Sequence, residues 1–297
     1  MNKYQEIFST KKAIVIDGLS LIYRAYFATW SQLATYSKNN WVPTNAVRMM
    51  IIMVSSLLKL KQYDYGLVAF DLSRKSFRTE LFTDYKSNRK TMEPDLVNQL
   101  PIIQKALELL GFKIIALDNF EADDIIGSFA QFCNQEKINV DIFTSDRDLL
   151  QLVNQFTTVN ILKKGVSDIK IYNYQNFATM NDGINPDQMI YVKALAGDSS
   201  DNYKGVSNIG PKTAIKLIKE HHNIEQLFDN LNQLPTKLQT TLINHKNQIE
   251  LFLKLATILK DVTIPKQLEY YLLKPDQTEA VDHFLKQYHL INLKKFF

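Results

Sequence analysis

The chain has 297 residues, of which 45% are hydrophobic and 22% are charged. This composition is typical of a globular protein with a full core, built as one large domain or two unequal ones. The net charge of +4, from 35 basic and 31 acidic residues, is too small to indicate a partner by itself.

Cys133 is the only cysteine, which excludes an internal disulfide and suits a reducing cytoplasm. The longest apolar run, residues 49–54, is too short to cross a bilayer. The N-terminal stretch MNKYQEIFSTKK has no apolar signal core. We therefore expect a cytoplasmic protein that has no contact with a membrane.

Short apolar segments alternate with helical patterns along the first half of the chain. One predicted helix has Thr44 as its N-cap, and another ends at Gly111, a typical C-terminal signal. The alternation predicts an α/β fold, in which a parallel sheet carries helices on both faces. The expected strands are residues 13–17, 66–71, 113–117 and 140–146, and the expected helices are residues 44–60, 94–112 and 122–135.

The pattern changes after about residue 184, where strand signals fade and helical stretches follow one another. The longest interruption is GDSSDNYKGVSNIGPKTA at residues 197–214. We therefore predict two regions, an α/β domain of residues 1–184 and a mostly helical region of residues 185–297.

Acidic residues stand at the carboxyl ends of the predicted strands. Because parallel strands end at one edge of the sheet, where ligands bind, we expect these side chains to meet. Any one of them is better explained as a turn residue or a helix cap, but nine together would repel one another. Seven of the nine lie at or beyond the ends of predicted strands: Asp17, Asp71, Glu121, Asp123, Asp124, Asp146 and Asp148. The stretch GDSSDN adds Asp198 and Asp201, whose three-residue spacing places them on one face of a helix or turn.

Hard divalent cations would neutralise such a cluster, since no nearby basic cluster is interleaved with these acids. All-oxygen ligands without a Cys/His set favour Mg²⁺ or Mn²⁺ over Zn²⁺. So many acids make a pair of ions plausible, and paired ions about 3.5–4 Å apart suit phosphodiester hydrolysis.

The stretch FEADDIIG at residues 120–127 places three of these carboxylates at the start of a predicted helix. The helix macrodipole and capping would favour acids there. However, two charges about 5 Å apart repel by roughly 3 kcal/mol at an effective dielectric constant of about 20. Glu121 and Asp124 share a helix face, whereas Asp123 points elsewhere. We therefore expect Glu121 to precede the regular helix, where the chain can turn it inward.

Basic and aromatic residues alternate in SRKSFRTELFTDYKSNRK, residues 73–90. Cations that bind phosphates beside rings that stack on bases are typical of nucleic-acid binding, although in isolation a solvated face with core aromatics is the better explanation. The segment follows Asp71 and therefore lies near the acidic edge. Lys86 or Arg89 could then stabilise charge on a phosphate.

A glycine-bearing turn, GVSNIGPKTA at residues 205–214, leads into a helix with Pro211 at its first position. The turn amides and the helix N-terminus form an anion site of phosphate size, with Lys212 nearby. A plain corner between two helices explains this segment equally well.

Together, these motifs resemble the 5′ nucleases, which comprise the 5′→3′ exonuclease domain of bacterial DNA polymerase I and the flap endonucleases. The resemblance covers Asp17 to Ala214 in the family's order. The matching blocks are IVIDG, AFD with SFR and YKSNR, FEADD, TSDRD, GDSSDN and GVSNIGPKTA.

The resemblance implies a PIN-like nuclease core with a helical arch at about residues 73–100 and a helix–three-turn–helix DNA-binding motif at about residues 190–222. It implies cleavage near DNA 5′ ends that leaves 5′-phosphates and depends on divalent metals. All nine acids fall where the family holds its metal ligands. The resemblance assigns Asp17, Asp71, Glu121, Asp123, Asp146 and Asp148 to a first site and Asp198 and Asp201 to a second, with Asp124 nearby. Lys86 and Arg89 fall on the catalytic positions of the arch. The implied DNA-binding residues are Arg78, Tyr85, Gly205, Asn208, Gly210 and Lys212.

The turn at residues 203–214, which we call the hairpin, departs from the family at two places. Tyr203-Lys204-Gly205 stands where Leu/Ile-Pro-Gly is usual, and Asn208 replaces the middle glycine. Asn is the non-glycine residue that best tolerates left-handed geometry, so we expect the turn to survive. A monovalent cation such as K⁺, bound by hairpin carbonyls, is a further family expectation.

The leading hypothesis is an Mg²⁺-dependent nuclease acting in replication and repair on DNA with 5′ flaps, nicks or gaps, and on RNA–DNA primer junctions. The sequence predicts a free-standing monomer, with a separate DNA polymerase as a potential partner. A DNA-structure-binding protein that has lost catalysis is an alternative, but no expected carboxylate or arch lysine is missing. A PIN-type ribonuclease is the other alternative; the hairpin motif and the basic arch favour duplex DNA.

Overall fold

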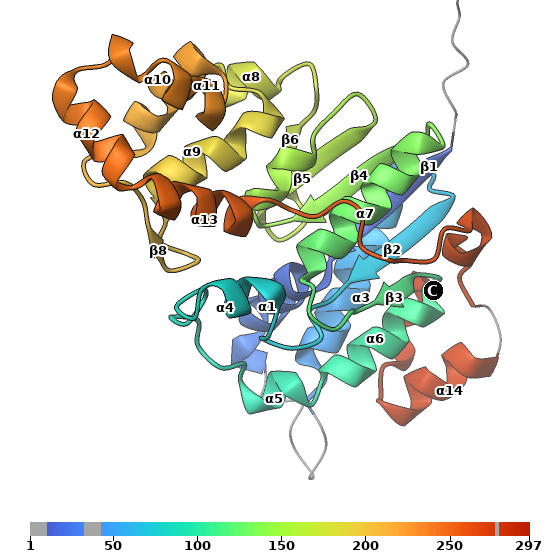
Figure 1. Ribbon diagram of the computed structural model, residues 1–297. Helices are drawn as coiled ribbons and strands as arrows, with labels where there is room; N and C mark the ends of the chain where they lie inside the picture. Colours follow the sequence, from blue (N-terminus) through green and yellow to red (C-terminus); the bar gives the residue numbers. More distant parts are fainter. Residues whose placement is uncertain (1–10, 33–42, 277–278) are drawn as a thin grey trace, which may run out of the picture.

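The computed structural model describes residues 11–32, 43–276 and 279–297. Its centre is a six-stranded sheet in the order β3-β2-β1-β4-β5-β6, with a group of helices at one side of it (Figure 1). The first five strands are parallel, and β6 pairs antiparallel with β5 at one edge. The strands are β1 (Lys12–Asp17), β2 (Tyr65–Ala69), β3 (Lys113–Ile115), β4 (Asn139–Thr144), β5 (Thr157–Lys164) and β6 (Asp168–Tyr172).

The strand order reverses beside β1. The chain passes from β1 to β2 and β3 on one side, and then crosses to β4 and β5 on the other. In open α/β sheets, ligands bind at such a switch point, beyond the carboxyl ends of the strands. Here the switch point lies between Asp17 at the end of β1 and Thr144 at the end of β4.

Alternate residues of β1 face two separate cores. Ile14 and Ile16 pack with α1, α3 and α6 on one face of the sheet, whereas Ala13 and Val15 pack with α7 on the other. No helix in the described part of the chain is long and apolar enough to span a membrane. The helices of this domain are α1 (Gly18–Ala28), α3 (Asn45–Leu58), α4 (Phe77–Leu81), α5 (Pro94–Val97), α6 (Leu100–Leu109) and α7 (Ala122–Gln135), with the 3₁₀ helix η2 (Asp148–Leu152).

A third core holds the helices that follow the sheet, drawn in yellow and orange in Figure 1. Phe82 of the arch packs edge-on against Phe252 of this core, with ring centroids 5.9 Å apart. The elements are α9 (Met189–Ala196), α10 (Pro211–His221), α11 (Ile224–Asp229), α12 (Thr236–Asn244) and α13 (Lys246–Ala256), with the short strands β7 (Gly197–Asp198) and β8 (Tyr203–Lys204). The helix before them, α8 (Phe177–Met180), packs in the core that contains α7.

After α13 the chain returns to the α/β domain. Tyr271, in the 3₁₀ helix η5 (Leu268–Tyr271), lies 4.5 Å from the Phe129 ring of α7. Buried residues of α14 (Glu279–Gln287) and the 3₁₀ helix η6 (Ile291–Phe296) join the core formed with α3 and α6. About the last forty residues were expected to belong to the helical region. Their buried side chains pack on the sheet domain instead.

The predicted α/β fold with a largely parallel sheet is confirmed, and the four predicted strands lie within two residues of their expected ends. The sequence did not reveal β5, β6 or α1. The predicted helix over residues 94–112 is broken into α5 and α6 at Gln99, whose buried amide oxygen accepts a hydrogen bond from Ala46 N. The arch is less helical than expected, with α4 and α5 as its helical parts and turns between them.

Candidate metal centre

Four carboxylates lie at the switch point of the sheet. Asp17 ends β1, Asp71 lies two residues beyond β2, Asp146 lies two residues beyond β4, and Asp123 is in the first turn of α7. Burial raises the pKa of Asp17 to about 7, and the charges of Asp146 and Asp71 add to the shift. The chain therefore brings like charges together at the edge where a ligand of this fold would bind.

A second carboxylate group adjoins the first. One oxygen from each of Asp148, Asp198 and Asp201 lies within 4.8 Å of the others. Asp148 begins η2, the element that follows β4, while Asp198 ends β7 and Asp201 lies in the turn between β7 and β8. Burial raises the pKa of Asp148 to about 7, with Asp146 as the next cause. The charge of Asp146 thus acts on a member of each group, on Asp17 in the first and on Asp148 in the second.

The donor set fits hard divalent cations. Burial, followed by the charges of Asp146 and other acids, raises the pKa of Asp123 well above its ordinary value. Within the ranges that the structure describes, no hydrogen bond reaches the Asp123 carboxylate, so no donor offsets the loss of water there. Both groups offer only carboxylate oxygens as ligands, and Mg²⁺ and Mn²⁺ favour such oxygens.

Basic side chains approach the acids from the arch and from α9. Lys86 Nζ lies 2.8 Å from Glu121 Oε2, and Arg89 Nη2 lies 2.9 Å from Asp201 Oδ1. Lys193 Nζ bonds to the carboxylates of both Asp148 and Asp198. The expectation that no basic cluster is interleaved with the acids is wrong in the folded chain, because packing brings Lys86, Arg89 and Lys193 to them.

Lys193 sets the charge state of Asp198. Burial alone would raise the pKa of Asp198, but the charge and hydrogen bond of Lys193, together with hydrogen bonds from Ser200, lower it to about 2. Lys193 lies on α9, five residues before Asp198. Lys193 was not among the predicted site residues, because a single lysine in an apolar helix is the only sign of it in the sequence.

The arch is fastened over the second carboxylate group. Lys86 N donates to Asp201 O at 3.0 Å, and Asn202 Nδ2 donates to Asp84 O at 2.9 Å and to Ser87 Oγ at 2.8 Å. Lys86 adopts a positive φ of 54° at this turn. Asn202 was not among the predicted site residues, although GDSSDN was recognised as a motif; its amide holds the turn that carries Lys86.

Tyr85 lies inside the site wall, with its side chain almost fully buried. Its hydroxyl, with a single proton to donate, lies within hydrogen-bond distance of Glu121 Oε2 (3.2 Å) and Asp201 Oδ2 (3.3 Å). The structure thus places Tyr85 as a link between two carboxylates, rather than on a surface open to DNA.

Glu121 precedes the regular helix, as expected. It is the N-cap of α7 with an extended backbone (φ −92°, ψ 160°), and its side chain turns toward Lys86. Burial would raise its pKa, but the charges of Lys86 and Arg78 lower it below its ordinary value. Glu121 is therefore an ionised carboxylate at the border of the cluster.

Arg78 and Asp124 depart from their expected places. Arg78 is 2% exposed and Asp124 is 0% exposed. The guanidinium binds the carboxylate through two bonds of 2.7 Å. Thus, in this structure, Arg78 is not available to a DNA surface, and Asp124 is not open to a cation.

The predicted hairpin residues divide into packing and surface positions. A Cβ on Gly205 would come within 2.4 Å of the Gly197 nitrogen, so the two glycines allow close backbone contact. Asn208 has the expected left-handed conformation, with φ of 64°. Gly210 is the N-cap of α10, with open space around its Cα, and Lys212 is exposed in the first turn. This end of α10 is accessible to an anion.

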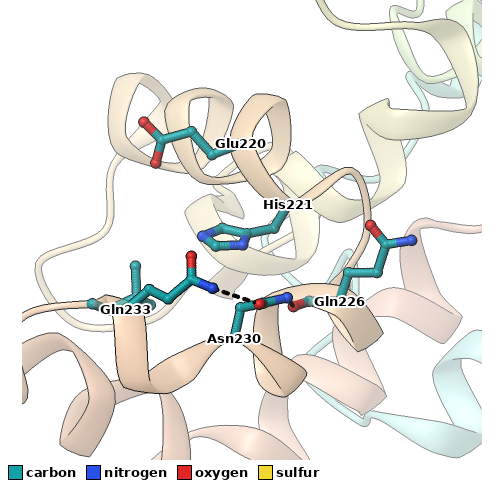
Figure 2. Close-up of a pocket in the computed structure, with 6 residues that line it drawn as sticks. Glu220, His221, Gln226, Asn230 and Gln233 are labelled. Carbon is teal, nitrogen blue, oxygen red and sulfur yellow. Dashed lines mark hydrogen bonds between the residues drawn. The ribbon is translucent and has the colours of Figure 1, made fainter.

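A separate pocket of 290 Å³ lies between α10, α11 and the segment after them, on the helical domain (Figure 2). Its lining includes Glu220 and His221, and Gln233 Nε2 donates to Asn230 Oδ1 at 2.8 Å. None of the predicted site residues lines this pocket. It is distinct from the carboxylate cluster.

Comparison with known families matches nearly the whole chain. Residues 12–181 match the 5′-3′ exonuclease N-terminal resolvase-like domain, and residues 184–279 match the 5′-3′ exonuclease C-terminal SAM fold. A 5′-3′ exonuclease of Mycoplasma pneumoniae is 42% identical over 287 residues, 97% of this chain and 99% of that protein. DNA polymerase I of Lactococcus lactis subsp. cremoris is 38% identical over 276 residues, which cover 92% of this chain but 31% of the polymerase.

Solved structures share the fold at low sequence identity. The T5 5′-exonuclease bound to zinc superposes with a TM-score of 0.68 at 20% identity, covering 95% of this chain and 99% of that one. The catalytic core of Rad2 in complex with DNA substrate gives a TM-score of 0.63 at 15% identity, covering 97% and 93%. The predicted PIN-like core with a helical C-terminal region is therefore confirmed, as is the predicted nuclease class. This chain belongs to the 5′-3′ exonuclease family.

Proposed function

We propose that the protein is an Mg²⁺- or Mn²⁺-dependent nuclease that hydrolyses DNA phosphodiester bonds near 5′ ends and leaves 5′-phosphates. The observation that carries this proposal is the pairing of two adjoining carboxylate groups with cations of the arch. Such a site can bind the phosphate of a strand and activate water beside it. We further propose that the protein acts in the cytoplasm as a monomer, in replication and repair.

The proposed metal ligands fall into two sets, which correspond to the two carboxylate groups. Asp17, Asp71, Asp123 and Asp146 would hold one ion, with Glu121 at its border. Asp148, Asp198 and Asp201 would hold the second. Divalent ions held there would supply the chemistry of a two-metal site, in which charge on the attacking and leaving oxygens is stabilised.

The arch residues would act on the phosphate itself. Lys86 and Arg89 reach carboxylates at the rim of the cluster with N–O distances of 2.8 and 2.9 Å. A phosphate entering beside those carboxylates would meet the same donors, which can stabilise the negative charge that builds up during hydrolysis. Tyr85, through its hydroxyl, would keep Glu121 and Asp201 oriented toward the reacting centre.

The hairpin would hold the duplex part of the substrate. The N-terminus of α10 offers free amides, and Lys212 adds a positive charge beside them. Gly205 and Asn208 would shape the turn, and Gly210 would let a phosphate approach closely. We propose that K⁺ or another monovalent cation binds the turn carbonyls, which a K⁺-dependent gain in duplex affinity would test.

The proposed substrates are DNA with 5′ flaps, nicks or gaps, including RNA–DNA primer junctions, and a separate DNA polymerase is the proposed partner. Cleavage of a 5′-labelled DNA flap with Mg²⁺, with Mn²⁺ or with EDTA tests the activity. We expect metal-dependent release of short products, whose length separates cutting at the junction from stepwise removal of nucleotides. Tight flap binding without cleavage in either metal would favour a DNA-structure-binding protein, and preferential cleavage of a matched RNA flap would favour a ribonuclease.

A further inference from the structure

The chain segment that leaves the helical domain is held by side chains of the elements that carry the acidic cluster. We call residues 255–259 the strap; they run from the end of α13 to the sheet domain. Arg78 of α4 donates from Nε to Leu255 O at 2.9 Å and from Nη2 to Thr257 O at 2.7 Å. The base of the arch is thereby tied to the strap.

Asp124 of α7 provides the second tie to the strap. Its Oδ1 accepts hydrogen bonds from Leu259 N at 2.9 Å and from Arg78 Nη2 at 2.7 Å. Its Oδ2 accepts from Arg78 Nη1 at 2.7 Å and from Glu121 N at 3.1 Å. A carboxylate has about four acceptor positions, and here all four are used. Asp124 therefore has no lone pair left for a cation, although its neighbours Glu121 and Asp123 face the cluster.

Gln151 provides the third tie, from η2. Its Nε2 donates to Ala256 O at 3.0 Å and to Asp148 O at 3.0 Å, and its Oε1 accepts from Ile258 N at 3.0 Å. Gln151 is 7% exposed. One amide thus joins the strap to the backbone of Asp148, a member of the second carboxylate group.

Close packing keeps the strap on α7. A Cβ on Gly127 would lie 2.7 Å from both Ile258 Cγ2 and Leu259 O. Beyond the strap, Val262 N donates at 2.9 Å to the hydroxyl of Ser128, the residue after Gly127 in α7. The strap therefore cannot shift along α7 without breaking several directional bonds at once.

We propose that Arg78, Asp124 and Gln151 are positioning residues that lock α4, α7 and η2 onto the strap and thereby fix the spacing between the arch cations and the carboxylates. This inference rests on the proposed function for its catalytic meaning. A bidentate guanidinium–carboxylate pair sets direction as well as distance, so it can hold Lys86 and Asp123 in register, and Gln151 ties Asp148 to the same strap. The strap also continues α13, so the same ties join the helical domain to the site.

A double-mutant cycle on Arg78 and Asp124 tests the proposal. We expect Arg78→Met and Asp124→Leu each to lower kcat by about 10- to 100-fold, as residues that orient ligands do. Because the two act as one unit, the double variant should lose little more than either single variant. Apolar replacement of a buried pair often preserves stability. The double variant should therefore have a higher Tm than either single variant, since neither charge is left buried without its partner, while its kcat and its Mn²⁺ affinity, measured by calorimetry, stay about tenfold or more below wild type.

The matched control is the ion pair between Lys61 and Asp141, with an N–O distance of 2.6 Å. Asp141 is a buried strand residue that also accepts from Tyr63 Oη at 2.9 Å. Lys61→Met with Asp141→Leu should alter Tm but leave kcat and Mn²⁺ affinity unchanged. Gln151→Ala should lower Mn²⁺ affinity in the same direction as the Arg78 variant.

Two results would overturn the proposal. Recovery of wild-type kcat and Mn²⁺ affinity in the double variant would show that the pair acts only in folding. A loss of Mn²⁺ affinity in Asp124→Asn equal to that of Asp146→Asn, with Arg78→Lys unchanged, would make Asp124 a metal ligand. If the wild-type protein fails to cleave DNA at all, the proposed function fails, while Mn²⁺ affinity still decides whether these residues position the carboxylates.

Discussion

The ammonium group of Lys86 lies 2.8 Å from Glu121 Oε2 and 4.9 Å from the centroid of the Tyr85 ring. The charges of Glu121 and Asp201 outweigh burial and raise the pKa of Lys86 above its ordinary value. The arch therefore delivers a permanent positive charge to the rim of the carboxylate cluster. A lysine that is held in place before the substrate arrives requires little reorganisation to stabilise a phosphate.

Replacement of Lys86 by Ala should lower kcat by about 100- to 1,000-fold, because a preorganised donor to the charge of the transition state is lost. Lys90→Ala is the matched control, since Lys90 is an exposed lysine of the same arch. Single-turnover cleavage of a labelled flap would measure both. Equal rates for the two variants would exclude a catalytic role for Lys86.

Asp146→Asn should remove most of the turnover, by roughly a hundredfold or more, because Asp146 links the two proposed metal sites. Its loss should also weaken Mn²⁺ binding. Asp118→Asn removes an exposed acid near the same edge and should change neither quantity. Near-normal cleavage by Asp146→Asn would contradict its assignment as a ligand.

The sequence was sufficient to locate the cluster, because parallel strands must end at one edge and the acids follow their last residues. It was insufficient to assign a partner to each acid. Arg78 is 46 residues away from Asp124, and only tertiary packing decides that this acid, rather than Asp123, receives the guanidinium. Similarly, β6 escaped prediction because this edge strand exposes most of its side chains, so its sequence lacks the apolar run that marked the inner strands.

The acid cluster should make stability depend on pH when divalent metal is removed. Asp17 and Asp148 have pKa values of about 7 in the fold against ordinary values of 3.8. Between these values the folded protein binds more protons than the unfolded chain, so the free energy of unfolding falls as pH rises. We expect Tm in EDTA to fall between about pH 5 and about pH 7.5, and Mg²⁺ to reduce that fall, since bound metal favours the ionised carboxylates.

Asp17→Asn provides a sharp test of this effect. Asp17 caps α1 by accepting from Ser20 N at 3.1 Å, and Asn is an equally good N-cap. In EDTA near neutral pH the variant should therefore have a higher Tm than the wild type, with a smaller gain on adding Mg²⁺. A lower Tm would mean that the charge of Asp17 does not destabilise the metal-free fold.

Lys212→Ala should weaken duplex binding without changing the rate of the bound complex. Lys212 is exposed in the first turn of α10, where the helix N-terminus attracts phosphate. Loss of one phosphate contact should reduce the slope of log K against log salt concentration by about 1. Lys237→Ala, an exposed lysine of α12, is the control and should keep the wild-type slope. Fluorescence anisotropy with labelled duplex in Ca²⁺, over a series of salt concentrations, gives the slopes. If the slope for Lys212→Ala equals that of the wild type, DNA does not reach this end of α10, and the hairpin serves only to pack α9 against α10.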